Sequence, residues 1–300
     1  METIIKTCNL SYSYERQKVV DNLYLEVPQH AIFGFLGPNG AGKTTTIKLL
    51  LGLLPSPENG IQIFDKELKS NRREILSKMG SLIEAPSIYR HLTAWENLAY
   101  LDKLYKKGTS RIEEVLKIIG LWEQCHKKAK HLSTGMKQRL GIGMAIFHDP
   151  ELIVLDEPVN GLDPAGIFEV RELLIKLQNE GKTIFLSSHL LSEIEKLCTH
   201  VGIIKKGSLL FQGEIKTLTS KAKRKVEIST DDNARAFAIL RSHAFPMLRN
   251  ERDGLEVEIA DQDRFSEMIS LLAADRIKLY DVEKKSATLE EVFIHLTSNE

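Results

Sequence analysis

One glycine-rich segment has the residue types and the spacing that bind phosphate. It reads Gly37-Pro38-Asn39-Gly40-Ala41-Gly42-Lys43-Thr44 and matches G-x-x-x-x-G-K-[ST] at every fixed position. Glycines let backbone N–H groups surround phosphate oxygens, and the N-terminus of a following helix adds a positive dipole end. Lys43 would place an ammonium against the β- and γ-phosphates, Thr44 would offer a hydroxyl to Mg²⁺, and Thr45 completes the loop. We predict a nucleoside triphosphate site over residues 37–45, in preference to a glycine-rich turn that binds nothing.

Two carboxylates, Asp156 and Glu157, follow a second apolar run, residues 152–155. Acids at the end of a buried strand are costly to bury unless a cation or hydrogen bonds accompany them. Asp156 is predicted to hold Mg²⁺ through water, and Glu157 to orient and polarise the attacking water. The alternative interpretation is two exposed acids at a strand end. It is disfavoured because a phosphate loop with Mg²⁺ needs such a second acidic strand end.

The elements that must position these residues alternate between strand and helix. An apolar run, residues 31–36, precedes the phosphate loop, and a helix is predicted over residues 44–54. A helical pattern extends from about Pro86 to Pro150, with a capping box at Thr93 to Glu96. Residues 24–27 predict a partly alternating strand, whereas three later runs predict buried parallel strands, namely 152–155, 183–186 and 201–204.

Composition narrows the class of protein. The chain has 300 residues, of which 42% are hydrophobic and 27% charged, as expected for a globular protein with a sizeable core. Lysine plus arginine equals aspartate plus glutamate at 41 each, which disfavours a dedicated nucleic-acid binder. Three scattered cysteines predict apolar packing rather than disulfides or a zinc site. The sequence shows neither a signal peptide nor an apolar run long enough to cross a bilayer.

A basic stretch, Lys221 to Lys225, indicates a domain boundary near residue 220. We interpret it as a solvated linker in preference to a site for an acidic partner. Beyond it, alternating strands are predicted at 226–228 and 255–259, and helices near 233–242, 263–273 and 289–296, the last opened by a capping box from Thr288 to Glu291. Residues 222–300 are therefore predicted to form a small accessory α+β domain.

Further motifs then make the sequence resemble the ATP-binding subunits of ABC transporters over roughly residues 1–218. Residues 132–139, Leu-Ser-Thr-Gly-Met-Lys-Gln-Arg, resemble the signature loop of that family. Residues 161–164, Gly-Leu-Asp-Pro, look like its D-loop, and Ser187-Ser188-His189 looks like its switch histidine. Tyr14 falls where the family has an aromatic residue that stacks on adenine, although it could simply pack with Tyr12. A GTPase is disfavoured because no guanine-reading N-K-x-D string is present.

The resemblance implies a fold and partners. It implies an α/β phosphate-loop ATPase core with an antiparallel β portion, a helical insertion at about 86–150 and the C-terminal appendage. It also implies ATP and Mg²⁺ as cofactors and a membrane permease as partner, with the chain on the cytoplasmic face of the membrane. In the family two chains enclose ATP, and we expect a homodimer in which Ser133 and Gly135 reach the partner's γ-phosphate. Asp163 would lie at the dimer contact and His189 at the γ-phosphate. Ser133 and Asp163 are also good helix N-caps on their own.

Some positions depart from the family pattern. Glu84 stands where most members have a glutamine; its oxygen can reach Mg²⁺, but it donates no hydrogen bond and adds negative charge. Thr134 and Met136 replace a common glycine and glutamine in the signature loop. This combination resembles transporters that remove bacitracin or lantibiotics from bacterial membranes, which indicates a subfamily trait more than a weakened ATPase.

In the family a coupling helix of the permease docks near the loop that holds Glu84. Pro86, Ile88 and Tyr89 give this loop a stiff, partly apolar surface, for which docking and local packing are equally open interpretations. Two other functions are weighed against a transporter ATPase. One is an ABC-type ATPase without a transporter, disfavoured because no long coiled-coil insertion or basic arm is seen. The other is a catalytically weak regulatory module, disfavoured by the retained Glu157 and His189.

Overall fold

The computed structural model describes residues 2–56, 60–220, 224–251, 254–285 and 288–298. The chain divides into two compact units, Met1–Glu214 and Ile215–Glu300, and each is described by itself. The larger unit carries all the residues of the predicted site.

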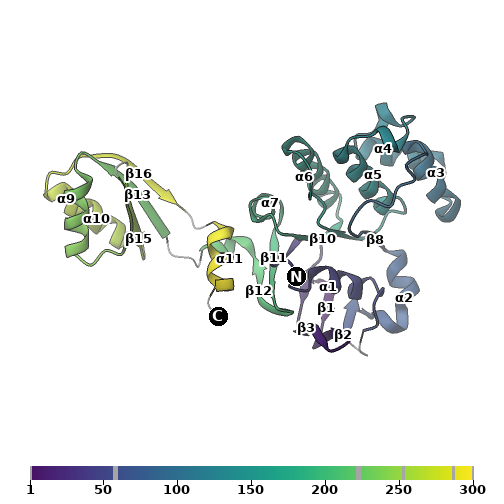
Figure 1. The fold of residues 1–300 in the computed structure, drawn as a ribbon, viewed down its shortest axis with the longest axis horizontal. Helices are drawn as coiled ribbons and strands as arrows, with labels where there is room; N and C mark the ends of the chain where they lie inside the picture. Colours follow the sequence, from purple (N-terminus) through teal and green to yellow (C-terminus); the bar gives the residue numbers. More distant parts are fainter. Residues whose placement is uncertain (1, 57–59, 221–223, 252–253, 286–287, 299–300) are drawn as a thin grey trace. The chain divides into compact units, whose positions relative to one another are not determined.

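A mostly parallel sheet forms the centre of the larger unit. Its strands lie in the order β12-β11-β5-β10-β9-β8 (Figure 1). Their bounds are β5 (Ile32–Leu36), β8 (Met79–Leu82), β9 (Leu152–Asp156), β10 (Thr183–Ser188), β11 (His200–Lys205) and β12 (Ser208–Glu214). All neighbours pair in parallel except β12, which is antiparallel to β11. The predicted buried parallel strands are confirmed.

Continuous apolar runs form these strands because helices or other strands cover both faces of the sheet. Every residue of β5, β9 and β10 is buried. Phe185 packs between Phe33 and Phe35, with ring centroids 5.7 and 5.5 Å apart. The carboxyl ends of β5, β8, β9 and β10 meet at one edge, since Leu36 pairs with Ser188, Asp156 with Ser187, and Leu82 with Leu155. The motif residues follow these strand ends.

Helices cover the two faces of the sheet. In Figure 1, α6 (Pro164–Asn179) and α7 (Leu191–Leu197) lie on one face, and α1 (Lys43–Leu50) on the other. The predicted helix over residues 44–54 is thus wrong at its end, because the chain turns after Leu50 and Gly52 adopts a left-handed φ of 62°. An antiparallel sheet, β4-β1-β6-β7, and a hairpin, β2-β3, complete that side.

The antiparallel strands are short. Their bounds are β1 (Thr3–Thr7), β2 (Leu10–Tyr14), β3 (Gln17–Leu23), β4 (Glu26–Pro28), β6 (Ile61–Ile63) and β7 (Lys66–Glu67), with α2 (Leu68–Ser77) following. The strand predicted over residues 24–27 is interrupted, since β3 ends at Leu23 and β4 begins at Glu26. Cys125 and Cys198 are buried as predicted, whereas Cys8 is exposed because it lies in the turn between β1 and β2.

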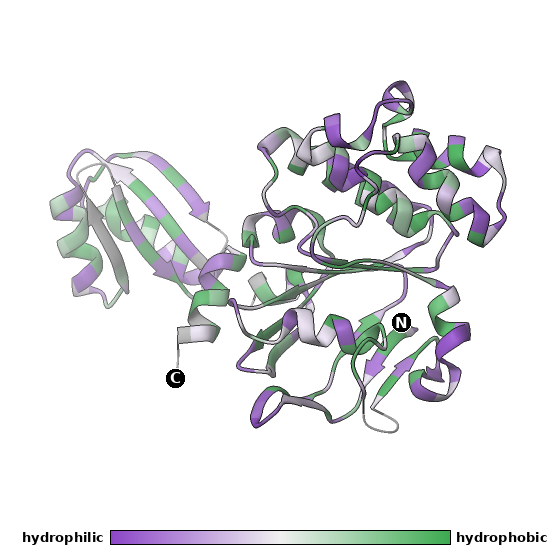
Figure 2. Cartoon of the chain, turned by 45° about the vertical axis from the view of Figure 1, so that its right-hand side comes forward, coloured by the Kyte–Doolittle hydropathy of each residue, from purple (hydrophilic) through white to green (hydrophobic). Residues whose placement is uncertain are grey.

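The predicted helical region is a group of helices beside the β8 edge of the sheet (Figure 1). It contains α3 (Ala94–Tyr105), α4 (Thr109–Ile118) and α5 (Thr134–Ile146), with 3-10 turns η1 (Trp122–Gln124) and η2 (Ala129–His131). The capping box at Thr93 and Glu96 is confirmed by both of its hydrogen bonds. Figure 2 shows hydrophobic and hydrophilic bands alternating along these helices, as expected for helices with one buried face.

The smaller unit has a β-α-β-β-α-β order and an antiparallel sheet, β14-β15-β13-β16, which is the ferredoxin-like arrangement. The bounds are α8 (Ile215–Ser220), β13 (Arg224–Thr230), α9 (Asn233–Ser242), β14 (Met247–Glu251), β15 (Gly254–Ile259), α10 (Gln262–Ala274), β16 (Leu279–Lys285) and α11 (Leu289–Ser298). Alternate strand residues, such as Val226, Ile228 and Val257, enter one core with α9 and α10. The predicted strands, helices and Thr288–Glu291 capping box are confirmed.

Candidate active site

The glycine-rich loop joins β5 to α1 and wraps closely against the sheet. A Cβ at Gly37 would lie 2.4 Å from the carbonyl oxygen of Ile204, and Gly42 has a left-handed φ of 106°, so both positions require glycine. Within the described residues, no side chain caps the N-terminus of α1 at Gly42. The first N–H groups of α1 therefore point out of the helix end, where an anion can accept from them.

Lys43 is the first residue of α1 and is 93% buried under this loop, with only 7% of its surface exposed. Its ammonium donates to the carbonyl oxygen of Gly37 at 2.7 Å and lies 3.7 Å from the Glu157 carboxylate. Backbone oxygens and one carboxylate thus hold the ammonium at the mouth of the loop, where it can meet phosphate oxygens.

Asp156 ends β9 and is almost completely buried, with 2% exposed. Its carboxylate accepts from the Thr44 hydroxyl at 2.9 Å and from the Ser187 hydroxyl at 2.5 Å. None of the ion pairs found among the described residues includes Asp156. Two hydroxyls leave the charge of a buried carboxylate uncompensated, and hard oxygen ligands next to a phosphate site suit Mg²⁺.

Glu157 follows Asp156 with a left-handed φ of 50°, a conformation that costs a non-glycine residue energy and that clusters at functional sites. Its N–H donates to the Ser187 hydroxyl at 3.0 Å, which fixes the turn. Its carboxylate accepts from His189 Nδ1 at 2.8 Å. Because an ionised carboxylate only accepts, Nδ1 carries the proton. The side chain is thereby held between an imidazole and the Lys43 ammonium.

The phosphate loop, Glu157 and His189 enclose a cavity of about 470 Å³. It is lined by Val19, residues 38–45, Glu157, Asn160 and His189. Sequence reasoning did not select Val19 or Asn160. Asn160 has a polar side chain directly before the Gly161 segment, which could have indicated it, whereas nothing in its residue type marks Val19. The structure therefore brings together the phosphate loop and the two residues predicted to be catalytic.

The signature and D-loop residues lie elsewhere on the larger unit. Ser133 caps α5 by accepting from the Met136 N–H at 3.2 Å, and Asp163 caps α6 by accepting from the Gly166 N–H at 2.8 Å. A Cβ at Gly135 would lie 3.5 Å from the Cα of Gly166, so the two helix N-termini are neighbours. Both predicted caps are present, and Ser133 and Gly135 do not line the cavity of their own chain.

Known proteins resemble this one over its whole length. The bacitracin transport ATP-binding protein BcrA of Bacillus licheniformis is 42% identical over 99% of this chain and 98% of its own. The chain belongs to the ATP-binding subunits of ABC transporters. A family model described as ABC transporter matches residues 20–160, and one described as AAA domain, putative AbiEii toxin, Type IV TA system, matches residues 128–195.

Two further comparisons agree. The lantibiotic transport ATP-binding protein SrtF of Streptococcus pyogenes is 39% identical over 70% of this chain and 91% of its own. A solved structure of an ATP-binding subunit of an ABC transporter is 28% identical in sequence and superposes with a TM-score of 0.65. The match covers 73% of this chain and 93% of the solved chain. As an ABC subunit, the chain binds and hydrolyses ATP to drive transport through a membrane permease. The described helices include none with the length and apolar character of a membrane span.

Tyr14 and Glu84, which were predicted to contact the nucleotide or Mg²⁺ in the ABC subunit, lie outside the cavity lining. Tyr14 on β2 is 44% exposed and packs edge-to-face against Tyr12, with ring centroids 5.0 Å apart. Glu84, two residues after β8, has a left-handed φ of 58°. Its carboxylate accepts from the Lys48 ammonium at 3.1 Å, and the structure does not join it to Thr44 and Asp156.

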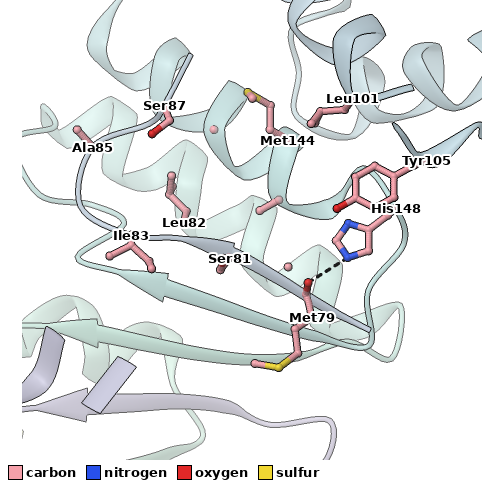
Figure 3. Close-up of a pocket in the computed structure, with 13 residues that line it drawn as sticks. Met79, Ser81, Leu82, Ile83, Ala85, Ser87, Leu101, Tyr105, Met144 and His148 are labelled. Atoms are coloured by element: carbon pink, nitrogen blue, oxygen red, sulfur yellow. Dashed lines mark hydrogen bonds between the residues drawn. The ribbon is translucent and has the colours of Figure 1, made fainter. Parts of the chain in front are cut away.

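A second cavity, of about 370 Å³, lies between β8, the loop after it, α3 and α5 (Figure 3). Ala85 and Ser87 line it, whereas Pro86, Ile88 and Tyr89 flank it and do not. Tyr105 and His148 stack 4.7 Å apart on one wall. His148 Nε2 donates to the Met79 carbonyl oxygen at 3.0 Å, and burial lowers the pKa of this histidine.

The flanking loop is held from beneath by Asn97, which is fully buried. Its amide accepts from the Tyr89 N–H at 2.8 Å and donates to the Tyr89 carbonyl oxygen at 3.2 Å. The Tyr89 ring is 41% exposed and meets the Tyr100 ring at 5.1 Å. The loop therefore presents aromatic surface on a fixed backbone, two residues after Ser87, which lines the second cavity.

Proposed function

We propose that the 470 Å³ cavity is the catalytic site and that Glu157 is the general base of ATP hydrolysis. The observation that carries this assignment is the position of its carboxylate, between the Lys43 ammonium and His189 Nδ1. Lys43 and the free N–H groups of α1 bind the β- and γ-phosphates, and residues 37–45 surround them. His189 holds the carboxylate toward the γ-phosphate, and Glu157 orients the attacking water.

Thr44 and Asp156 are the proposed ligands of Mg²⁺, directly or through water. When bound, the ion neutralises charge on the β- and γ-phosphate oxygens. The arrangement supports this because Thr44 already directs its hydroxyl to the buried Asp156 carboxylate. Tyr14 remains our proposed stacking partner for adenine, supported by its exposed ring at the end of β2.

The test is Glu157→Gln, which keeps the shape of the side chain and removes its basicity. We expect steady-state phosphate release to fall by at least about 100-fold, because a positioned general base contributes that much. ATP affinity should stay within about twofold. The matched control is Glu151→Gln, an exposed glutamate whose change should leave turnover unaltered. Normal hydrolysis by Glu157→Gln would remove Glu157 from this role.

We propose that two identical chains close around two ATP molecules. The α5 N-terminus, capped by Ser133, would donate from Gly135 to the partner's γ-phosphate, with Asp163 beside it. Glu157→Gln with ATP should therefore elute as a dimer in light scattering. Adding Gly135→Asp should restore the monomer through charge repulsion, since a Cβ at this position meets only ordinary contacts. A dimer that persists would exclude this interface.

We propose that the permease docks at the mouth of the second cavity, at the cytoplasmic face of the membrane. Pro86, Ile88 and Tyr89 supply the rim, and the fixed backbone at Tyr89 supports this. Ile88→Asp should weaken co-purification with the permease while ATP hydrolysis by the isolated chain persists. Unchanged assembly would contradict docking at this loop.

We propose an antimicrobial peptide of the bacitracin or lantibiotic type as cargo, supported by the names of the relatives BcrA and SrtF. Expressing the chain with its permease in a sensitive bacterium should raise the inhibitory concentration of such a peptide, and Glu157→Gln should abolish the gain. Equal sensitivity with and without the transporter would exclude this cargo.

We assign ATP binding to residues 1–218 and an accessory role to residues 222–300, supported by the two compact units.

A further inference from the structure

Glu84 lies outside the cavity lining, but it follows a strand that ends beside Asp156, and its backbone φ is left-handed. The strand pairing of Leu82 with Leu155 places the end of β8 beside the end of β9, so Glu84 and Asp156 leave the sheet at the same edge. Glu84 adopts a left-handed φ of 58°, a conformation that is uncommon for a non-glycine residue. A carboxylate is thus held near the edge at which the triphosphate binds.

Lys48 supplies the opposite charge. It lies four residues after Thr44 on α1, so the two side chains share one face of the helix, a turn apart. Its ammonium is 3.1 Å from the Glu84 carboxylate, and no other acid pairs with it in the ion pairs of the described residues. The Lys48 side chain is 33% exposed and the Glu84 side chain 67%, so Lys48 is the more buried partner of the pair.

An unneutralised carboxylate here would repel the triphosphate. ATP carries several negative charges, and Coulomb repulsion between exposed groups extends over about one Debye length, about 8 Å at physiological salt. An amide at position 84 would need no counter-charge, whereas a glutamate does. We propose that Lys48 is a positioning residue for ATP binding, which neutralises and orients the Glu84 carboxylate beside the nucleotide site.

An ordinary surface ion pair is the competing explanation. Exposed pairs contribute little to stability, and such a pair would not change nucleotide affinity. The two explanations differ in one measurable property, the dependence of the Lys48 effect on the charge of residue 84. A double-mutant cycle isolates that dependence.

The experiment compares the full-length chain with Lys48→Met, Glu84→Gln and the double variant. Dissociation constants for a ribose-labelled fluorescent ATP analogue are measured with Mg²⁺ and with a chelator. We expect Lys48→Met to weaken binding about two- to fivefold under both conditions, the range expected for one partly exposed charge pair. In the Glu84→Gln background the same change should alter the dissociation constant less than about 1.5-fold. Lys48→Arg should bind like the wild type.

Lys66→Met is the matched control, because Lys66 forms a comparably exposed ion pair with Glu74. It should leave the dissociation constant unchanged, and urea unfolding identifies any variant that does not fold. Lys48→Met effects of equal size in both backgrounds, or no effect in either, would overturn the proposal. The inference rests on the proposed nucleotide site, but the experiment distinguishes the two. If the wild-type chain does not bind the analogue, the proposed nucleotide site is wrong. If Lys48→Met has the same effect in both backgrounds, only the proposed role of Lys48 is wrong.

Discussion

Replacing Ser187 with alanine tests how the two acidic strand ends are held together. The Ser187 hydroxyl is fully buried, donates to the Asp156 carboxylate at 2.5 Å and accepts from the Glu157 N–H at 3.0 Å. The alanine variant keeps β10 intact but removes both contacts. Asp156 retains the Thr44 hydroxyl, whereas the N–H of the strained Glu157 loses its acceptor.

The magnitude follows from these two contacts. A hydrogen bond to a charged group is worth about 1.5–3 kcal/mol, and an unsatisfied buried N–H costs about 1–3 kcal/mol. Because the two share one hydroxyl, we expect a loss of about 3 kcal/mol in the free energy of unfolding of the larger unit. Relaxation of Glu157 by a few tenths of an ångström should lower kcat about tenfold or more.

Urea unfolding followed by tryptophan fluorescence measures this loss of stability in the larger unit. The sequence has two tryptophans, Trp95 and Trp122, and both lie in Met1–Glu214. With an m-value of about 3 kcal/mol per M, the midpoint should fall by about 1 M. The control is Ser77→Ala, which removes an exposed hydroxyl and should cost below about 0.5 kcal/mol. A Ser187→Ala midpoint equal to that of the control, with unchanged kcat, would refute the bridging role.

Three further predictions follow from caps, close approach and pKa. Asp163→Ala should lower the free energy of unfolding by about 1 kcal/mol in the urea assay, and an unchanged midpoint would contradict the cap to Gly166. Gly37→Ala should weaken ATP binding at least about tenfold, because its Cβ would meet the Ile204 carbonyl oxygen, and wild-type affinity would exclude that contact. Burial lowers the pKa of His148 below 6.5, so the unfolded chain binds more protons and stability falls as pH drops below about 6.5. His148→Gln should flatten this loss between about pH 7 and about pH 5.5, and an identical pH dependence would exclude His148 as a source.

Features that depend on neighbouring residues were predictable from the sequence. The strand, loop and helix around Gly37 are confirmed, as are the caps at Ser133 and Asp163. Each rests on hydrogen bonds or backbone angles set within a few positions, which residue types reveal directly. The convergence of Glu157 on Lys43 also follows, because parallel strands end at one edge of a sheet.

Features that depend on distant contacts were not predictable. The bridging contacts of Ser187 join residues 30 and 31 positions away, and the Lys48–Glu84 pair spans 36. The place of Asn160 in the cavity lining likewise needs the fold. The end of α1 at Leu50 was missed because apolar residues continue to Leu54, and only the left-handed Gly52 shows the turn.

The strand order of the smaller unit has a consequence for synthesis on the ribosome. Its first strand, β13, pairs with its last, β16, so this unit cannot complete its sheet until β16 has emerged. The larger unit ends at Glu214, and 285 − 214 = 71 residues separate it from the end of β16 at Lys285. At about 5–20 residues per second, the translation of those residues takes about 4–14 s. A nascent chain therefore carries a finished nucleotide-binding fold for seconds before its C-terminal neighbour exists.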